Sequence, residues 1–148
     1  MTAEAETAEG EIRALLDRLA TAIRDKDVGA ALAPFDDAVL TFDLAPPLWV
    51  QGKGEEARQA ISAWFATWSG PIGYDRRGFA VAIDSDIAFA HGYVRIHGTK
   101  RDGEKPDVWA RQTVCLRRRD GVWRIVHDHT SVPFYMDGSY RAAVDLQP

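Results

Sequence analysis

The sequence predicts an α+β fold in which helices cover one face of an antiparallel sheet. Apolar residues follow helical spacing in the first half of the chain, and segments of extended character fill the second half. The joints between those segments are rich in Asp, Gly and Ser, which favour tight turns. The 148 residues are most simply one domain, 1–148, with residues 1–8 expected to be frayed.

Three helices are expected before the strands. The first runs from about Ala8 to Asp25, where apolar residues recur every three or four positions. Asp27 can cap a short second helix that ends near Pro34. The third spans about Gly54 to Trp68 and is closed by Gly70-Pro71.

The strands begin with Ala38–Asp43, which Ala45-Pro46-Pro47 interrupts because prolines cannot donate to a sheet ladder. Extended structure resumes at Leu48–Gln51. Four longer strands follow at residues 72–84, 87–99, 108–119 and 122–132. The turns between them are Ser85-Asp86, Arg101-Asp102-Gly103 and Asp120-Gly121.

Composition narrows the class of protein. Hydrophobic residues make up 46% and charged residues 27%, as in ordinary globular domains, and the net charge of −4 argues against general affinity for nucleic acid or anionic membrane. The single cysteine, Cys115, cannot form an internal disulfide. The start of the chain is acidic and Ala-rich, and no segment approaches the ~20 apolar residues of a membrane span. The expected location is cytoplasmic.

The last strand carries an unusual gradient. With alternating side chains, one of its faces holds Trp123, Ile125, His127, His129 and Ser131. Apolar groups at one end of that face give way to two imidazoles and a hydroxyl at the other. This pattern indicates a sheet that packs a core at one end and lines a cavity at the other.

Asp120-Gly121 allows two registers for the last hairpin. A two-residue turn sets Arg111 opposite Thr130. A three-residue turn, with Gly121 left-handed and bulged, pairs Trp109 with Ser131, Arg111 with His129, Thr113 with His127, and Cys115 with Ile125. We favour the second, because it gathers the polar residues on one face and leaves Gln112 and Asp128 on the other.

In the strand before this hairpin, the better core face by hydropathy holds Ala88, Ala90, Gly92, Val94 and Ile96. The opposite face holds Phe89, His91, Tyr93, Arg95 and His97. Hydropathy therefore does not by itself place Arg95 in the interior.

These segments together resemble the nuclear-transport-factor-2-like superfamily, in its SnoaL-like and ketosteroid-isomerase-like branch. The resemblance rests on Phe42-Asp43-x-x-Pro46-Pro47-Leu48, Trp64-Phe65 with Gly70-Pro71, Arg95-Ile96-x-Gly98-Thr99, Asp107-x-Trp109-x-Arg111-x-Thr113, and Asp120-Gly121-x-Trp123-x-Ile125-x-His127-x-His129-x-Ser131-x-Pro133. It runs from about residue 10 to the C-terminus. The last segment is also similar to the association domain of calcium/calmodulin-dependent kinase.

The resemblance implies a cone: a curved, mixed sheet whose concave face is covered by about three helices that enclose a pocket. It also implies a homodimer. The residues that it places toward the pocket are Asp43, Arg95, Trp109, Arg111, Thr113, His127, His129 and Ser131, with Trp64, Phe65 and Trp68 as an apolar wall. Function is less constrained than fold, because this fold hosts several enzyme classes and non-enzymatic binding modules.

Asp43 matches, within one residue, the general base of the ketosteroid isomerases. It can remove a proton next to a carbonyl, or it can be a permanent partner of Arg95 or Arg111. A carboxylate held by guanidinium in the ligand-free protein would weaken the base hypothesis.

Two departures from the isomerases argue against a steroid substrate. Leu19 stands near the position of their oxyanion-stabilising tyrosine, and Thr113 or Val114 stands near their second acid. The cationic and donor groups of Arg95, Arg111 and His129 suit a carboxylate, phenolate or enolate oxygen instead.

Two functions therefore remain open. The first is a cofactor-free enzyme that isomerises, cyclises or dehydrates a carbonyl-bearing or aromatic substrate, with Asp43, Arg111, His127 and His129 catalytic and Trp64, Trp68, Arg95, Trp109, Thr113 and Ser131 binding the ligand. The second is a non-catalytic module for ligand binding or dimerisation, with an internal Asp-Arg-His network. No metal is expected, since hydrogen-bonded imidazoles are the simpler interpretation of His127-x-His129.

Overall fold

The computed structural model describes residues 2–148, and within them the chain forms three helices and one six-stranded sheet. The elements in order are α1 (Ala3–Arg24), α2 (Val28–Leu32), β1 (Phe35–Phe42), β2 (Val50–Gln51), α3 (Glu55–Ala66), β3 (Trp68–Asp84), β4 (Ile87–Lys100), β5 (Asp107–Arg119) and β6 (Val122–Ser131). Helices precede a long meander, so the predicted α+β class is confirmed.

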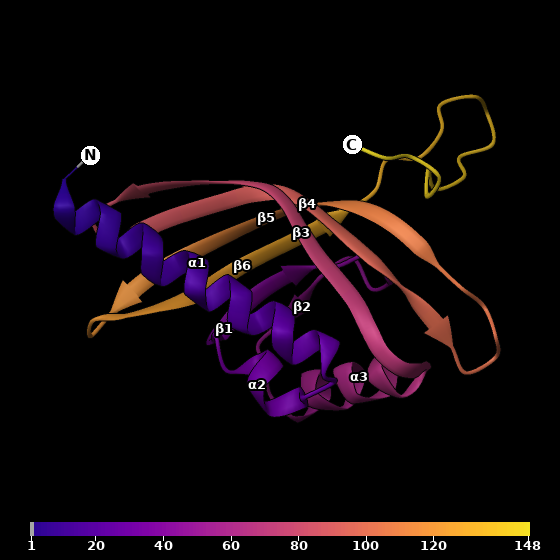
Figure 1. Cartoon of the computed structure of the whole chain (residues 1–148), viewed down its shortest axis with the longest axis horizontal. Helices are drawn as coiled ribbons and strands as arrows, with labels where there is room; N and C mark the ends of the chain where they lie inside the picture. Colours follow the sequence, from indigo (N-terminus) through magenta and orange to yellow (C-terminus); the bar gives the residue numbers. More distant parts are fainter. Residues whose placement is uncertain (1) are drawn as a thin grey trace.

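The sheet order is β2-β1-β6-β5-β4-β3. Only the contact between β1 and β6 is parallel, and the other four are antiparallel. The sheet is therefore mixed. It is also curved, and α1 crosses its concave face diagonally while α2 and α3 lie at one end (Figure 1).

Helix α1 begins earlier than the sequence predicted. Thr2 accepts a hydrogen bond from the backbone nitrogen of Ala5 at 3.2 Å, so the first turn is capped and ordered from Ala3. Residues 3–8, which we expected to be frayed, lie within α1, so the predicted helix start near Ala8 is wrong, and Met1 lies outside the described residues. The buried face of α1 consists of Ala8, Ile12, Leu15, Leu16, Leu19, Ala20, Ala22 and Ile23.

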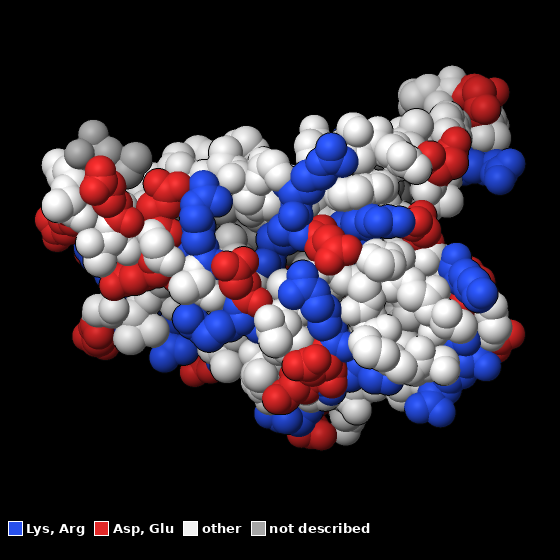
Figure 2. All heavy atoms as spheres, in the orientation of Figure 1, with Lys and Arg blue, Asp and Glu red and all other residues white. Residues whose placement is uncertain are grey.

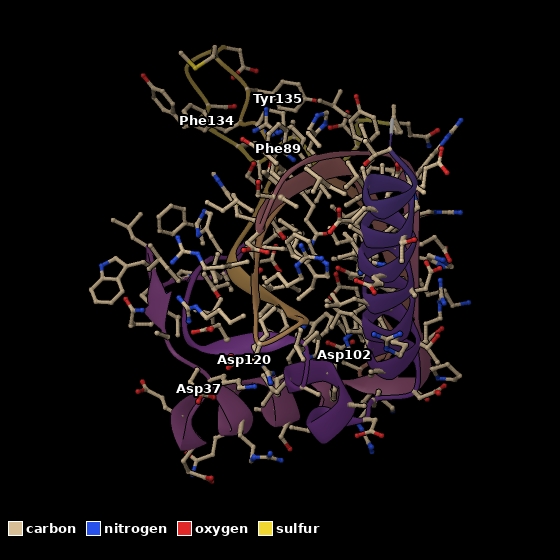
Figure 3. The ribbon with its side chains drawn as sticks, turned by 90° about the vertical axis from the view of Figure 1, so that its left-hand side faces the viewer. Asp37, Phe89, Asp102, Asp120, Phe134 and Tyr135 are labelled. Atoms are coloured by element: carbon tan, nitrogen blue, oxygen red, sulfur yellow. The ribbon has the colours of Figure 1, made fainter. Side chains whose placement is uncertain are left out.

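The core lies between this helix face and the concave face of the sheet. In β4 and β5 the buried residues alternate strictly: Ala88, Ala90 and Val94, then Ala110, Gln112, Val114 and Leu116. The set in β4 is the core face that hydropathy predicted. Viewed from the side, side chains fill the space between α1 and the sheet (Figure 3).

The hairpin between β5 and β6 does not have the register that we favoured. Asp120 and Gly121 both have positive φ, 53° and 75°, which forms a two-residue turn with Arg119 opposite Val122. Further along, Leu116 pairs with Ile125 but Cys115 pairs with His127, so Val126 has no partner and the strand bulges there.

The bulge reverses the alternation of β6. Before it, Trp123 and Ile125 face the core, 5% and 0% exposed. After it, the parity shifts by one residue, so Asp128 and Thr130 take the concave face. His127, His129 and Ser131 turn to the outer, convex face, where the ladder sets Arg111 opposite Ser131 and Thr113 opposite His129.

The inward placement expected for the polar set is therefore wrong. Arg111, Thr113 and His129 are on the outer face together with His127, Ser131 and Trp109, which are half-buried there. Arg95 lies opposite Trp109 in the ladder and shares that face. For His127, His129 and Ser131 the physical reason is the bulge, because one unpaired residue changes the face of every residue that follows it. Trp109, Arg111 and Thr113 face outward because they alternate with the buried residues of β5.

Candidate functional site

An open cavity of about 840 Å³ lies where β1 and β6 end. Its walls come from the end of β1, the loop that leads to β2, and the last residues of β6 and beyond. The lining residues are Phe42, Asp43, Leu44, Ala45, Pro46, Pro47, Leu48, Trp49, His129, Thr130, Ser131 and Val132. We call this the mouth cavity. Its walls are mostly apolar with a few polar groups, as is usual for a small-ligand site.

Asp43 lies in the wall of the mouth cavity, directly after β1. One of its carboxylate oxygens, Oδ1, accepts a hydrogen bond from the backbone nitrogen of Leu44 at 2.7 Å. Among residues 2–148, no lysine, arginine or histidine forms an ion pair with it. The structure therefore does not show the ion pair that the alternative hypothesis requires, in which Asp43 is a permanent partner of an arginine.

The two histidines of β6 pack against β1. His127 donates from Nδ1 to the Leu40 carbonyl at 2.6 Å, which holds the ring in one orientation. The Phe42 ring meets both imidazoles edge-on, at 4.7 Å from His127 and 5.4 Å from His129. His129 lines the mouth cavity together with Ser131, whose hydroxyl accepts from Arg111 Nη2 at 3.3 Å.

Arg95 is not available to a ligand in the mouth cavity. It forms a two-pronged pair with Asp107, with Nε–Oδ1 at 2.8 Å and Nη2–Oδ2 at 2.6 Å. Hydrogen bonding within this pair raises the pKa of Arg95 and lowers the pKa of Asp107. Trp109, its neighbour across the ladder, lies under Arg77 with the guanidinium 5.7 Å from the ring centroid.

The tryptophans of α3 and β3 form a separate cluster. Trp64 meets Trp68 edge-on at 5.9 Å, and Lys100 Nζ lies 3.9 Å from the centroid of Trp68. Trp68 is 2% exposed, and neither ring lines the mouth cavity. Trp64 and Trp68 pack in the core where α3 meets β3. The structure therefore gives no support to their predicted contact with a ligand in the mouth cavity.

A buried polar network on the concave face was not predicted. Gln112 Nε2 donates to Asp128 Oδ1 at 3.1 Å and lies 3.5 Å from the hydroxyl of Tyr74. Burial raises the pKa of Asp128 to about 6 and the pKa of Tyr74 to about 12. The carboxyl of Asp128 can therefore be neutral or charged near physiological pH, which is a property of acid–base groups.

This network reaches toward the mouth cavity. Thr41 of β1 is the ladder partner of Asp128, and Asp43 lies two residues further along the chain. The negative charge of Asp43 contributes to the raised pKa of Asp128. Thr130, two residues beyond Asp128 on the same face, lines the cavity. Asp128 itself does not line the cavity, but its ladder position and the effect of the Asp43 charge connect it to the cavity wall.

The sequence did contain a signal for this network. Ala110, Val114 and Leu116 occupy one parity of β5, and mostly polar residues occupy the other. Between Val108 and Leu116, Gln112 is the single polar residue of that parity, which marks a buried polar side chain that needs partners. Asp128 carried no such signal, because the bulge at Val126 decides its face.

Two kinds of feature are absent from the described part of the chain. No group of three or more His, Cys, Asp or Glu within residues 2–148 could hold a metal ion. In the same residues, no helix has the length and apolar character that crossing a membrane requires.

Residues 12–135 match the SnoaL-like domain family. The chain belongs to this family. Among solved structures, an NTF2-like protein of unknown function from Pseudomonas putida KT2440 is 32% identical, with a TM-score of 0.86 over 97% of this chain and 98% of that one. The comparison with curated proteins gave no match.

More distant structures share the fold alone. An NTF2-like superfamily protein from Salmonella enterica is 20% identical, with a TM-score of 0.75 over 91% of this chain and 97% of that one. The association domain of C. elegans CaMKII is 18% identical, with a TM-score of 0.68 over 88% and 99% of the two chains. The curved mixed sheet of this SnoaL-like chain is thus the NTF2-like cone, as the sequence predicted.

Proposed function

We propose that this SnoaL-like protein binds a small carbonyl-bearing or aromatic molecule in the mouth cavity and catalyses proton transfer on it without a cofactor. The observation that carries the proposal is a pair of carboxyl groups that influence each other: Asp43 in the cavity wall, and Asp128, whose pKa is raised in part by the charge of Asp43. Two carboxyl groups in different environments can divide the roles of base and acid between them.

Asp43 is suited to remove the proton. Its carboxylate has no cationic partner among residues 2–148, and it lies against an apolar wall formed by Leu44, Leu48 and Trp49. A proton taken from the carbon next to a carbonyl leaves an enolate, whose oxygen needs a donor. His129 and Ser131 line the same cavity and supply donors.

Asp128 is suited to exchange a proton near pH 6. Its raised pKa of about 6 results chiefly from burial, and the Gln112 amide keeps its carboxyl in one position. Return of the proton from Asp43 to a different carbon of the enolate would complete an isomerisation and leave both carboxyl groups in their starting states. Arg111 and His127 remain predicted helpers at the outer rim, and Arg95 is occupied by Asp107.

Assembly through the outer sheet face is a second proposed function. Large apolar side chains are exposed on that face, with Phe89 47% and Tyr93 44% exposed, beside a stacked His91. Faces of this kind mark protein–protein contacts. The similar C. elegans structure is itself an association domain. A homodimer through this face is compatible with the mouth cavity as a ligand site.

The enzymatic proposal can be tested by exchange of carbon-bound hydrogen. A panel of 1,3-dicarbonyl compounds and hydroxylated aromatic ketones is incubated with the protein in D2O, and deuterium uptake is followed by mass spectrometry. We expect catalysed exchange on at least one compound, and native mass spectrometry should show that compound bound.

The matched variants are Asp43→Asn and Asp128→Asn. The amide side chain introduced by Asp43→Asn keeps an oxygen that can accept from the Leu44 N–H, so this variant should lose exchange while binding persists. Asp128→Asn should lower the rate and remove its dependence on pH near 6. Exchange that survives in both variants would refute the carboxylate mechanism, and binding without exchange on any compound would favour a binding module.

A further inference from the structure

A second, smaller cleft of about 240 Å³ opens between α1 and β3. It shares no residue with the mouth cavity. Its lining consists of Arg13, Leu16, Asp17, Arg76, Arg77 and Phe79, so half of the wall residues are arginines. In the space-filling view, basic side chains gather with interleaved acids along α1 and the neighbouring part of β3 (Figure 2). We call this the arginine cleft.

Arg76 is the partly buried member of the arginine cleft. Its Nη1 donates to the Leu16 carbonyl in the middle of α1. Its guanidinium lies 5.7 Å from the Tyr74 ring centroid and 5.6 Å from that of Phe79. Burial lowers the pKa of Arg76, but a guanidinium starts from so high a value that it stays charged at neutral pH.

One edge of that guanidinium has no partner. The Nε and Nη2 atoms of Arg76 are both buried and neither makes a hydrogen bond within the described residues. Unpaired buried donors are unfavourable, more so when the group is charged. Arginine also commonly binds a carboxylate through its Nε–Nη2 edge, by two parallel hydrogen bonds.

The other two arginines are placed to complete such a site. Arg13 bonds the Phe79 carbonyl at 3.3 Å and pairs with Glu9 at 2.8 Å, while Arg77 lies over Trp109. Both have exposed side chains that can shift toward an incoming anion. Asp17 in the wall and Glu9 beside it offset part of the positive charge. The small remaining excess suits a singly charged anion better than a doubly charged one.

We propose that the arginine cleft binds the carboxylate group of a small organic acid through the Nε–Nη2 edge of Arg76, which is buried in the ligand-free chain and becomes accessible when the surrounding side chains of the cleft shift. Arg13 and Arg77 close over the bound group from the α1 and β3 sides. The volume is below the ~300–1,000 Å³ of pockets for drug-sized ligands, so the acid is small. The site is independent of the proton transfer proposed for the mouth cavity.

The test is a titration of the ¹⁵N-labelled protein with sodium acetate, against sodium chloride at equal ionic strength. We expect the Arg76 Nε–Hε signal to shift saturably with acetate only. Arg76→Lys keeps a charge and a donor for the Leu16 carbonyl but removes the two-pronged edge, so acetate affinity should fall at least tenfold. Arg118→Lys, whose side chain pairs with Asp86 outside the cleft, is the matched control and should bind as wild type.

Equal shifts with chloride would overturn the proposal, because they would reflect ionic strength alone. Unchanged acetate affinity in Arg76→Lys would overturn it as well. Tighter binding of phosphate than of acetate would contradict the assignment to a carboxylate. If Arg76→Lys does not fold, the Arg76 signal of the wild-type protein still decides, together with Arg13→Gln and Arg77→Gln, which change exposed side chains.

Discussion

The side-chain amide of Gln112 donates to Asp128 Oδ1 at 3.1 Å from the neighbouring strand. Gln112 is only 3% exposed, and its Oε1 is buried without a partner among the described residues. A neutral Asp128 could donate to that oxygen after rotation of the amide, whereas a charged Asp128 can only accept. The protonation state of Asp128 therefore decides which hydrogen bonds Gln112 and Asp128 can form on the concave face.

This relationship predicts a specific dependence of stability on pH. The pKa of Asp128 is raised to about 6 in the folded chain, above its unfolded value near 3.8, so the folded state binds its proton more tightly. The resulting stabilisation is complete below about pH 4 and is lost as pH rises through 6. The shift corresponds to about 3 kcal/mol. Asp128→Asn should remove this loss, which urea unfolding at pH 4 and pH 7.5 would measure.

Other groups also titrate between pH 4 and pH 7.5. The test therefore compares how the free energy of unfolding changes with pH in wild type and in Asp128→Asn. The free energy of unfolding of wild type minus that of Asp128→Asn should fall from pH 4 to pH 7.5. Asp37→Asn changes an exposed carboxylate and provides the control, with no such change expected. A constant difference between wild type and Asp128→Asn would mean that Asp128 is not the titrating group.

Much of the fold could be predicted because its determinants are local. The helical spacing of Ile12, Leu16 and Leu19 found α1, and the alternation of Ala88, Ala90 and Val94 found the core face of β4. Each depends on a residue and its near neighbours along one element. The helix start at Ala3 was missed because the single Thr2 cap near the start of the sequence is a weak signal.

The site was less predictable because it depends on one unpaired residue. Alternation placed His127 and His129 on the face of Trp123, but the bulge at Val126 separates them. A bulge depends on how two strands fit over the whole curved sheet, and Val126 has no residue pattern that marks it. Asp43 lines the mouth cavity, while the partner carboxyl Asp128 could not have been found without the register.

Two glycines should respond in opposite ways to alanine. In β4, a Cβ on Gly92 would clash with the Phe79 ring and lie 2.9 Å from the Arg77 carbonyl, so Gly92→Ala should destabilise by about 1–3 kcal/mol. In α1, nothing lies within 4 Å of a Cβ on Gly10, and Gly10→Ala should stabilise by about 0.5–1 kcal/mol. Thermal unfolding measures both. A neutral Gly92→Ala would show that Phe79 moves freely.

Alanine substitutions at Arg111 and His129 should have different effects on ligand affinity. Arg111 is exposed on the outer face with one 3.3 Å contact to Ser131, so Arg111→Ala should change stability by less than about 0.5 kcal/mol. It should also leave the affinity of a mouth-cavity ligand within about threefold, a change worth less than ~1 kcal/mol. His129→Ala removes a wall of that cavity and should weaken binding more, as isothermal titration calorimetry can measure. A greater loss with Arg111→Ala would show that the guanidinium reaches the ligand.

The proposed dimer predicts that a charge on the outer face will separate the protomers without unfolding them. Phe89 is 47% exposed in the single chain, so Phe89→Lys should cost the monomer little. In a dimer interface the same ammonium would be buried without a partner, which costs several kcal/mol and shifts the equilibrium to monomer. Val144→Lys changes a side chain of equal exposure in the C-terminal segment, outside the strands of the sheet, and should remain dimeric. Sedimentation velocity at micromolar concentration measures all three proteins, and a monomeric wild type, or a Phe89→Lys variant that stays dimeric, would exclude this face as the interface.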